Sequence, residues 1–576
     1  MFKKIYQKCI VNRKGRITTI IIAASVLAVA VVAATTAILI SHLNKPKAES
    51  NNSLYVKADK NEQTDSGPEK DRNREQKDET DTDGTNSKGS EDISSGNISQ
   101  TEYVSTPQTE YATMTEKDIL SQYRGNTDWR INSIRGTETK VKPTGNGIAY
   151  YISAKGSDKN DGLTPETPKK TINAVNSLPL KSGDVVYFRR GDVWRGQVKA
   201  STNGVTYSAY GNGKKPEIYA STRDGAKSGK WTETSTKGIY KYSFIFSSDV
   251  GTIVFDDSKC AIKCILRHEP DGDYNNTTGE KFNSYADLNK DLHFYHDPSG
   301  ALYLRCNKGN PATVFKSIEF SIKNHVFAIG ADNVTIDNIC IKYCGSHGVG
   351  AGTRTGLTVT NCEFKWIGGS IQAEGIYGRN FATRYGNGVE IYGGCDNFTV
   401  KNCYFSQIYD AAVTFQFSTN DGRKITMNNV DFSDNVMEYC NYSVEYFLTA
   451  SNDSLIKNVT IKNNSMWYAG FGLCEQRPDK SCDSHIKAWD HSNRTDGTFR
   501  ITDNIFAFAR NDLLQSNAKD GEYGPTYSNN IYIQYKYGNL GSNGRTKTVY
   551  SFDDNVKYIL NQRFGDTSPK IIFAEG

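Results

Sequence analysis

The chain has 576 residues, a formal net charge of only +5, 37% hydrophobic and 11% aromatic residues, and twelve cysteines. Much of the positive charge lies at the extreme N-terminus, so the rest of the chain has no basic surface of the kind that nucleic-acid-binding proteins carry. We therefore expect no nucleic-acid partner, and the apolar content allows a large buried core.

The N-terminal 40 residues have the pattern of a membrane anchor. Only basic residues charge segment 1–16, and residues 17–40 follow without any charge. A run of that length crosses a bilayer with some tilt, and the polar residues after it offer no small-residue cleavage site. Because positive charges precede the span, the N-terminus is expected in the cytoplasm and the remainder outside the cell. The sequence thus predicts a single-pass membrane protein with an extracellular C-terminal domain.

Residues 41–115 are rich in Asn, Ser, Thr, Gly, Glu, Asp and Lys and have few large apolar side chains. Such a composition buries too little surface to fold, so it predicts a disordered extracellular linker. A lead-in segment, 116–147, follows. The spacing of Thr115 and Asp118 resembles a capping box and predicts a short helix at 115–120.

Short motifs rich in Gly, Asp and Pro begin at residue 150. They are Tyr-Tyr-Ile-Ser at 150–153, Gly-Ser-Asp-Lys-Asn-Asp-Gly at 156–162, Pro-Glu-Thr-Pro at 165–168, Lys-Thr-Ile at 170–172, the run 183–192 and Tyr-Gly-Asn-Gly-Lys-Lys-Pro at 210–216. Glycine and proline at these intervals mark tight turns between short strands. The motifs resemble the opening of bacterial right-handed parallel β-helix proteins of the pectate-lyase-like superfamily. The resemblance implies the fold over about 147–506, but this superfamily contains lyases, glycosidases, epimerases and non-catalytic surface proteins.

A second pattern, Thr-Val-x-Asn followed by a large apolar residue, recurs six times between 333 and 511. Its Asn or Asp positions are spaced by 23, 41, 32, 29 and 40 residues, and they are Asn338, Asn361, Asn402, Asp434, Asn463 and Asp503. A fixed unit with loops of variable length is typical of a β-solenoid, and Asn suits the bend between successive sheets. We predict an all-β, right-handed parallel β-helix over 148–576, with a β-rich insertion near 221–311 where the repeat is not visible.

Three residues past each large apolar position lies a column of small or apolar residues that is expected to point inward. Its members are Cys344, Ile367, Ile408, Cys440, Ala469 and Ala509. The strands that follow place Gly350, Glu390, Thr414, Glu445 and, less securely in register, Cys474 in one outward column, with Gln416 one outward step later.

Because neighbouring strands lie about 4.8 Å apart, Glu390 and Glu445 are expected about 9 to 10 Å apart. Inverting glycosidases place their two catalytic carboxyls roughly 6.5 to 9.5 Å apart. The alternative is a pair of solvated glutamates on a sheet face.

Further candidates lie in turns beside this column. Asp410 and Tyr409 precede one strand, and His347 occupies nearly the same turn one coil earlier. We predict that Asp410 is a third catalytic carboxylate and that His347, Tyr409 and Gln416 contact substrate. Similar Tyr-x-Gly-x-His-Gly and Tyr-Asp-Ala turns occur in the proteins that the chain resembles. A histidine that only bonds a neighbouring backbone carbonyl is the structural alternative.

A long loop at 474–493 interrupts the repeat and carries three candidate substrate-binding residues, Arg477, His485 and Trp489. Long loops on a rigid scaffold often carry function. Arg477 is suited to a bidentate contact with a uronate carboxylate, and Trp489 to stacking on a sugar ring. Alternatively, Arg477 pairs with Glu475 or Asp479 and fastens the loop. Cys474 and Cys482 form the one candidate disulfide.

The sequence is compatible with a bound metal ion and with more than one reaction. Asp158, Asn160 and Asp161 are calcium-ligand types, yet their run is also a turn motif, so Ca²⁺ is a candidate cofactor without further support. The predicted function is that of a cell-surface protein that hydrolyses glycosidic bonds of a polysaccharide with Glu390, Glu445 and Asp410. The alternatives are a uronate lyase or epimerase, and a glycan-binding or adhesive surface protein without turnover.

Overall fold

The computed structural model describes residues 111–373, 379–477, 483–489, 494–516, 524–544 and 546–575. The predicted cytoplasmic tail, the predicted span 17–40 and the predicted linker up to residue 110 lie outside these residues. Within them, no helix has the length and apolar character needed to cross a bilayer.

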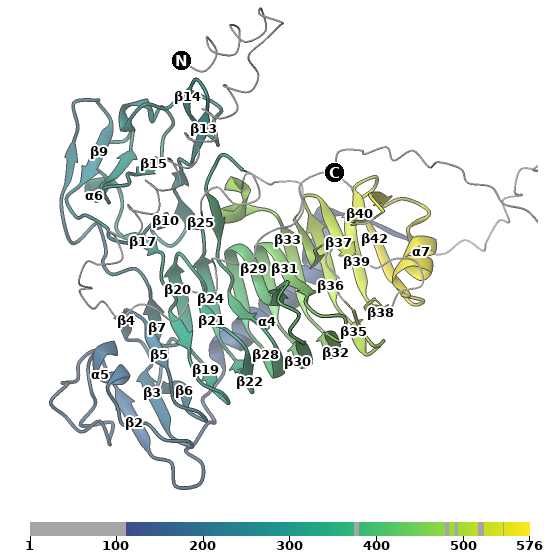
Figure 1. The fold of residues 1–576 in the computed structure, drawn as a ribbon, viewed down its shortest axis with the longest axis horizontal. Helices are drawn as coiled ribbons and strands as arrows, with labels where there is room; N and C mark the ends of the chain where they lie inside the picture. Colours follow the sequence, from purple (N-terminus) through teal and green to yellow (C-terminus); the bar gives the residue numbers. More distant parts are fainter. Residues whose placement is uncertain are drawn as a thin grey trace, which may run out of the picture. The chain divides into compact units, whose positions relative to one another are not determined.

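Successive short strands stack in parallel register on three faces and form a parallel β-helix (Figure 1). One face, which we call the site face, consists of β5 (Val198–Ala200), β18 (Phe327–Ile329), β21 (Val349–Ala351), β27 (Val389–Tyr392), the second halves of β29 (Tyr404–Ser418) and β31 (Val436–Thr449), β34 (Ser484–Ala488), β37 (Asp512–Ser516) and β40 (Asn539–Asn543).

The second face shares β29 and β31 with the site face, because these two strands run through the corner between the faces. Its other members are β4 (Val193–Arg195), β7 (Glu217–Tyr219), β20 (Cys340–Cys344), β24 (Glu363–Ile367), β33 (Ser465–Ala469), β36 (Ile505–Ala509), β39 (Ile531–Tyr535) and β42 (Lys570–Glu575). We call it the covered face.

The third face is a separate parallel sheet. It contains β2 (Ala149–Ile152), β3 (Val185–Arg189), β6 (Thr206–Tyr210), β19 (Thr335–Asp337), β23 (Thr358–Thr360), β28 (Cys395–Lys401), β30 (Thr426–Ser433), β32 (Leu455–Lys462), β35 (Phe499–Thr502) and β38 (Thr526–Ser528). The short β22 (Arg354–Thr355) also pairs with β28.

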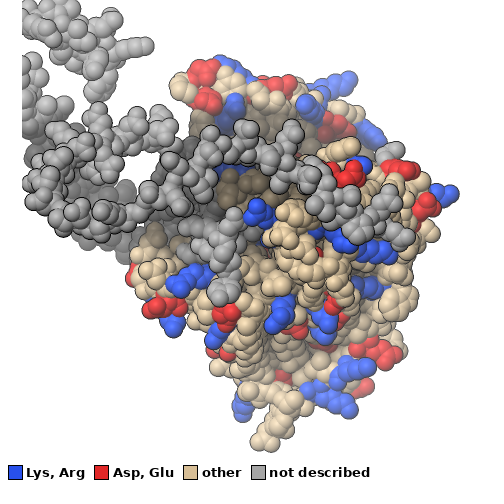
Figure 2. All heavy atoms as spheres, turned by 90° about the vertical axis from the view of Figure 1, so that its right-hand side faces the viewer, with Lys and Arg blue, Asp and Glu red and all other residues tan. Residues whose placement is uncertain are grey.

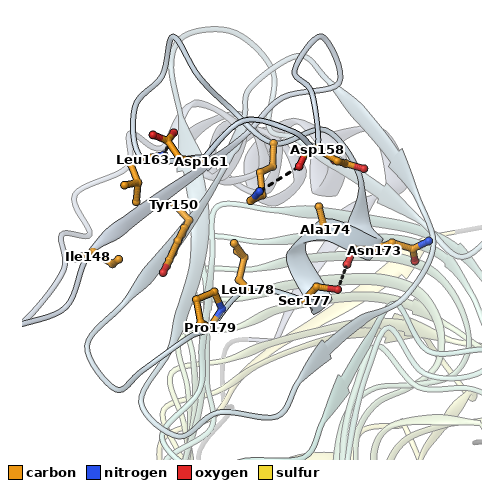
Figure 3. A pocket seen from close by; sticks show the side chains of 11 residues that line it. Ile148, Tyr150, Asp158, Asp161, Leu163, Asn173, Ala174, Ser177, Leu178 and Pro179 are labelled. Carbon is orange, nitrogen blue, oxygen red and sulfur yellow. Dashed lines mark hydrogen bonds between the residues drawn. The ribbon is translucent and has the colours of Figure 1, made fainter.

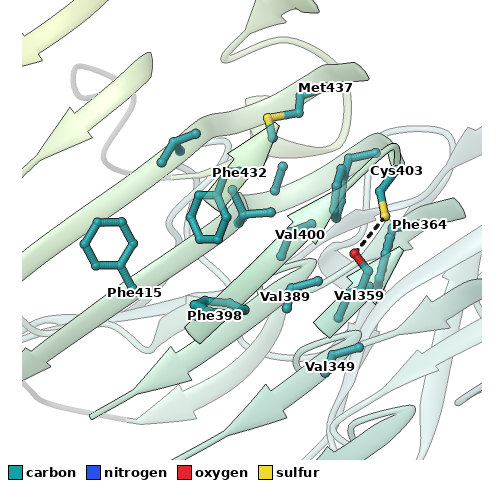
Figure 4. Close-up of a cluster of buried hydrophobic side chains, with 14 of the residues drawn as sticks. Val349, Val359, Phe364, Val389, Phe398, Val400, Cys403, Phe415, Phe432 and Met437 are labelled. Atoms are coloured by element: carbon teal, nitrogen blue, oxygen red, sulfur yellow. Dashed lines mark hydrogen bonds between the residues drawn. The ribbon is translucent and has the colours of Figure 1, made fainter. Parts of the chain in front are cut away.

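Apolar side chains from all three faces fill the interior of the coils. Figure 4 shows part of this core. Phe364 and Phe405 come from adjacent coils, and their rings stack with centroids 4.6 Å apart. The predicted inward column is confirmed, because its members pair in register and are at most 7% exposed; they are Cys344, Ile367, Ile408, Cys440, Ala469 and Ala509. A stack of this kind buries a continuous core that no single coil could form alone.

The predicted turn residues have the left-handed backbone expected of them. Positive φ angles of 51° to 60° occur at Asn338, Asn361, Asn402, Asp434, Asn463 and Asp503. Asn and Asp tolerate this conformation better than most other residues. A second left-handed column, which we did not predict, lies at the corner between the covered and site faces and contains Tyr343, Trp366, Gln407, Tyr439, Tyr468 and Phe508.

Directly after the left-handed turns of the later coils lies a line of buried asparagines, which we call the asparagine ladder: Asn435, Asn464, Asn504 and Asn530. Each side-chain amide donates to a backbone carbonyl of the preceding coil, as Asn464 does to Phe432 at 2.8 Å. Each side-chain oxygen accepts from the preceding coil, so the ladder is hydrogen-bonded from end to end. The sequence motif of the ladder is Asp-Asn or Asn-Asn at each turn. We did not predict the ladder from this motif.

The covered face is occupied by the segment that precedes the solenoid. β1 (Ala112–Thr115) pairs in parallel with β42, so the predicted disordered linker ends at least four residues earlier than 115. Thr115 caps the helix as predicted, accepting from the Asp118 backbone N–H. The helix is longer than the predicted six residues, because α3 (Glu116–Ile119), η1 (Leu120–Arg124) and α4 (Gly125–Gly136) follow one another without a break.

The predicted insertion is a β-rich unit with a core of its own. Its five-stranded sheet runs in the order β12 (Ile262–Lys263), β15 (His293–His296), β16 (Leu302–Arg305), β9 (Ile239–Tyr242) and β8 (Trp231–Glu233). β10 (Val250–Phe255) pairs with β11 (Lys259–Cys260) and with β17 (Ile318–Ile322), and β17 pairs with β20 of the covered face. Asp257 fastens the unit to the coils by accepting from Lys342 and Trp366 at 2.9 and 3.0 Å.

The remaining elements are short. They are α5 (Ile172–Asn176), β13 (Leu266–Glu269), β14 (Gly272–Asn275), η2 (Tyr285–Asp287), α6 (Pro311–Val314), β25 (Ser370–Ala373), β26 (Thr383–Tyr385), η4 (Gly472–Gln476), β41 (Thr548–Ser551), α7 (Val556–Ile559) and η5 (Leu560–Phe564). On the face shown in Figure 2, the acidic and basic side chains are interspersed and do not gather in a large patch of one sign.

The ten cysteines among the described residues are all free thiols. Cys344 and Cys440 are fully buried, as predicted for the inward column. Cys474 bonds the backbone oxygen of Phe471. Its predicted partner, Cys482, lies outside the described residues.

Candidate functional site

The outward column on the site face has the predicted order. Strand register pairs Gly350 with Glu390, Glu390 with Thr414 and Thr414 with Glu445. The next partner is Lys487 of β34, because Cys474 lies in η4 and not in a strand. We call Glu390, Thr414, Glu445 and Lys487 the site column. The two glutamates are two strands apart, which corresponds to about 9 to 10 Å between backbones.

Glu390 is 8% exposed and is surrounded by hydrogen-bond donors. Its Oε2 accepts from Asn387 Nδ2 and, at 2.9 Å, from Gln416 Nε2. The orientation of the Asn387 amide is fixed, because its Oδ1 accepts from the Ala411 backbone N–H at 2.8 Å. Donors that converge on a carboxylate favour its ionised form. The predicted contact residue Gln416 therefore binds Glu390 in this structure.

His347 reaches the same carboxylate from the preceding coil, with its Nε2 3.4 Å from Glu390 Oε1. The Asn387 backbone N–H donates to His347 Nδ1 at 3.1 Å, so the ring proton belongs on Nε2 and faces Glu390. Burial lowers the pKa of His347 to about 4, and the ring is neutral above that pH. His347 thus contacts Glu390, whereas the sequence suggested a substrate contact.

A second imidazole, that of His325, lies under His347 with ring centroids 5.1 Å apart. Its Nδ1 accepts from the His347 backbone N–H at 3.2 Å. Gly350 leaves space for this ring, since a Cβ there would lie 3.0 Å from it. His325 was not among the predicted site residues. Its position was predictable, because His325 precedes His347 by 22 residues and the same step separates Ala328 from its strand partner Gly350.

Glu445 is 4% exposed and has a strongly altered acidity. Its pKa is raised to about 8. Burial is the largest cause, and the negative charge of Asp410 contributes more to the rise than that of Glu390. The Trp489 indole and the Arg477 charge oppose the rise without cancelling it. At neutral pH, Glu445 therefore carries its proton while Glu390 sits among donors that favour the charged form. Paired carboxyls with opposite protonation states are typical of acid–base catalysis.

Asp410 and Arg477 form a buried ion pair beside Glu445. Arg477 Nη1 donates to Asp410 Oδ1 at 2.6 Å, and the two side chains are 3% and 6% exposed. Arg477 is thus bonded to Asp410, a partner that neither the predicted substrate contact nor its structural alternative named. Glu475, one of the two partners in that alternative, accepts from the Gly472 backbone N–H. Asp479 lies outside the described residues. The guanidinium also lies over the rings of Tyr409 and Tyr442, at 5.5 and 5.6 Å.

Trp489 closes the other side of Glu445. Its Nε1 donates to Glu445 Oε1 at 2.5 Å, and the Lys487 ammonium lies 3.9 Å from the centre of the Trp489 ring. Lys487 also bonds Gln515 of the next coil. The structure therefore places Trp489 beside Glu445, where its indole N–H bonds a carboxyl and the side chain is partly exposed.

Two predicted contact residues are corrected. Tyr409 is fully buried, with Arg384 4.5 Å from its ring centre, and it supports the arginines rather than facing outward. His485 is also fully buried, with Nδ1 bonded to Ser443 and Nε2 to the Ala507 carbonyl. Tyr409 follows the left-handed Gln407, and His485 lies at the start of β34. At such positions the alternation along a strand does not predict side-chain direction.

The site also includes Asn387 and Lys487, which sequence reasoning missed. Asn387 lies between two glycines, as does the segment that holds His347, and this similarity was a usable signal. Lys487 was hidden, because the loop before β34 has no counterpart in the repeat.

Two of the candidate calcium residues, Asp158 and Asp161, line a pocket on the N-terminal coils (Figure 3). Asp158 accepts from the Lys170 and Thr171 backbone N–H groups, both at 2.9 Å, and Asp161 accepts from Leu163 and Thr167. Asn160 donates to the Pro168 carbonyl. These side chains hold the turns together, which is the structural alternative for this motif. Over the residues described, no three metal-binding side chains are grouped to hold an ion.

Comparison with known proteins identifies the fold. Residues 324–550 match the sequence model of the right handed beta helix region, and the described domain is a right-handed parallel β-helix. A comparison with curated proteins finds no match.

Several solved structures are similar to this chain. A complex of XylC with xylose has a TM-score of 0.39 and 10% identity over 67% of this chain and 69% of that chain. A GH136 lacto-N-biosidase from Eubacterium ramulus has a TM-score of 0.34 and 13% identity over 80% and 70%. The surface protein and adhesin PfbA of Streptococcus pneumoniae has a TM-score of 0.27 and 14% identity over 66% and 81%. At these scores the similarities assign neither a reaction nor a ligand to this chain.

Proposed function

We propose that this protein hydrolyses glycosidic bonds of a polysaccharide, with Glu445 as general acid and Glu390 as general base. The observation that carries the proposal is a pair of buried carboxyls in one column, of which one has a raised pKa and the other accepts two side-chain hydrogen bonds. Glu445, with a pKa raised to about 8 by burial and by Asp410, holds a proton at neutral pH. Glu390, bonded by Asn387 and Gln416, is held as a carboxylate.

The reaction follows from these two states. Glu445 donates its proton to the glycosidic oxygen as the bond from that oxygen to the anomeric carbon breaks. Glu390 accepts a proton from a water molecule, whose oxygen attacks the anomeric carbon. The products are two free sugar hydroxyl groups, and exchange with solvent returns Glu390 and Glu445 to their starting states. A separation of two strands lies at the upper edge of the range for inversion.

The neighbouring residues have supporting roles in this proposal. Because the indole N–H of Trp489 donates to Glu445 Oε1, the proton of Glu445 is left on Oε2. Asp410 raises the pKa of Glu445, and its ion pair with Arg477 keeps Asp410 itself charged in a buried site. This assignment differs from the predicted third catalytic carboxylate, since Asp410 acts through Glu445.

We also propose that residues 17–40 anchor the chain in the cell membrane, with the β-helix outside. The support is the charge pattern of the first 40 residues. Protease treatment of intact cells tests this arrangement. In untreated cells the full-length chain is expected in the membrane fraction, and in treated cells the protease should digest the β-helix domain. A domain that is protected from the protease would contradict the arrangement.

The test of the reaction uses the detergent-solubilised full-length protein on a panel of neutral and uronic-acid polysaccharides. New reducing ends without absorbance near 235 nm are expected, and they should disappear in the Glu390→Gln, Glu445→Gln double variant. Unsaturated products would establish a lyase instead. Binding without products from any polysaccharide would favour the non-catalytic surface protein.

A further inference from the structure

Two buried polar side chains of the site have no hydrogen-bond partner within the described residues. They are Thr414, whose hydroxyl is unbonded, and Asn441, whose amide nitrogen and oxygen are both unbonded. The two side chains are 0% and 1% exposed. A buried polar group without a partner costs about 1 to 3 kcal/mol, so native proteins rarely retain one without a reason.

Both residues occupy informative positions. Thr414 pairs directly with Glu390 on one side and Glu445 on the other, so it lies at the centre of the site column. Asn441 follows Cys440, which pairs with Ile408, and precedes Tyr442, which pairs with Ala411. The register therefore places Asn441 on the coil beside Asp410, in the same strand as Glu445.

The charged groups around them already have partners of opposite or complementary character. Arg477 is bonded to Asp410, and Lys487 is bonded to Gln515 and lies over Trp489. A sugar carboxylate in this site would face Glu390 and Asp410 at short range, and like charges in a buried site are unfavourable. The groups that lack partners are a hydroxyl and an amide, which are neutral donors and acceptors.

We propose that Thr414 and Asn441 bind hydroxyl groups of a neutral sugar ring, and that this site therefore selects neutral polysaccharides over uronic-acid polymers. The inference rests on the proposed hydrolase function. Because both side chains are at most 1% exposed, the sugar reaches them only when the side chains that cover them move aside. Sites built to bond a hydroxyl discriminate strongly against ligands that lack one, because their buried polar groups are then left unpaired.

The experiment compares Thr414→Val, Thr414→Ser and Asn441→Leu with the wild-type full-length protein. Steady-state hydrolysis is measured on neutral xylan, mannan and glucan and on polygalacturonate and alginate. We expect wild-type turnover of a neutral polymer, and a loss of about 5- to 20-fold in kcat/KM for Thr414→Val and Asn441→Leu, as for one lost neutral hydrogen bond or slightly more. Thr414→Ser retains the hydroxyl and should stay within about twofold of wild type.

Thermal melting provides a second readout that a structural role would move. Because neither side chain forms a hydrogen bond to the part of the protein that the structure describes, Thr414→Val and Asn441→Leu should keep the melting temperature or raise it. A fall of several degrees in both variants would overturn the inference, as would unchanged kcat/KM in both or a wild-type preference for uronic-acid polymers. Absence of products from every polymer would instead overturn the proposed function itself, and the inference with it.

Discussion

The asparagine ladder and the site column are both lines of buried polar residues that run across successive coils, but only the ladder is self-sufficient. Asn464 donates to Phe432 and Asn504, and its own oxygen accepts from Asn435. In the site column, the Thr414 hydroxyl has no hydrogen-bond partner among the described residues, and Glu445 is buried with a proton that it would lose in water at neutral pH. One line stabilises the fold, and the other holds groups whose partners arrive with a ligand.

The largest expected effect breaks the site column alone. Glu445→Gln and, separately, Glu390→Gln should each lower kcat by about 10²- to 10⁴-fold, the range for loss of a general acid or base. Circular dichroism spectra should match those of wild type. Release of reducing ends from a neutral polysaccharide provides the measurement. A variant that retains more than a tenth of wild-type kcat would remove that residue from the proposed mechanism.

The converse change breaks the ladder. Asn464→Leu leaves the Phe432 carbonyl and the Asn435 amide without their partner, and we expect a loss of about 3 kcal/mol or more in the free energy of unfolding. Urea denaturation followed by fluorescence measures it. Below the melting range, kcat/KM should be unchanged. Lys462→Leu, at an exposed position two residues earlier at the end of β32, serves as the matched control and should change stability little.

The pH dependence separates the two lines further. Activity should fall as pH rises through about 8, because Glu445 then loses the proton that it donates. The folded-state pKa of Glu445 lies above the ordinary value of 4.5 that the unfolded chain has. Between these two values the unfolded chain releases this proton and the folded chain keeps it, so the stability contribution is present below about pH 4.5 and is lost as pH rises through about 8.

Glu445→Gln cannot make that contribution. The free energy of unfolding of this variant, relative to that of wild type, should therefore rise between about pH 4.5 and pH 8, by about a few kcal/mol for a pKa shift of this size. Denaturant titrations at pH 5 and pH 8.5 compare the two proteins. An equal difference at both pH values would contradict a protonated Glu445. Asn464→Leu should show no such trend.

The smallest effect concerns the support of Glu390. His347→Phe removes the Nε2–H that faces Glu390 Oε1 but keeps an aromatic ring over His325. We expect kcat to fall about tenfold or less, with KM nearly unchanged, because Asn387 and Gln416 still bond the carboxylate. The acidic limb of the pH profile should move to higher pH, as Glu390 becomes easier to protonate. His347→Gln should recover part of the loss, and an unmoved limb would assign His347 to packing alone.

Much of the fold followed from local sequence. The recurring Asn or Asp fixed the left-handed turns, as at Asn361 with φ of 54°, because this conformation restricts the choice of residue at a single position. The spacing of those turns then placed Glu390, Thr414 and Glu445 in register, since period-two alternation holds within each strand. Prediction failed where the alternation is interrupted, at the corner that contains Tyr409 and in the loop before His485.

The sequence by itself determined the parallel β-helix, its inward column and the common register of the two glutamates, because each depends on a repeat along the chain. The tertiary structure alone decided what those carboxyls are. Asn387 and Gln416 surround Glu390, and Asp410 lies against Glu445, although the chain separates these groups by as many as 35 residues. Protonation depends on burial and on neighbours in space, and no pattern along one strand contains either quantity.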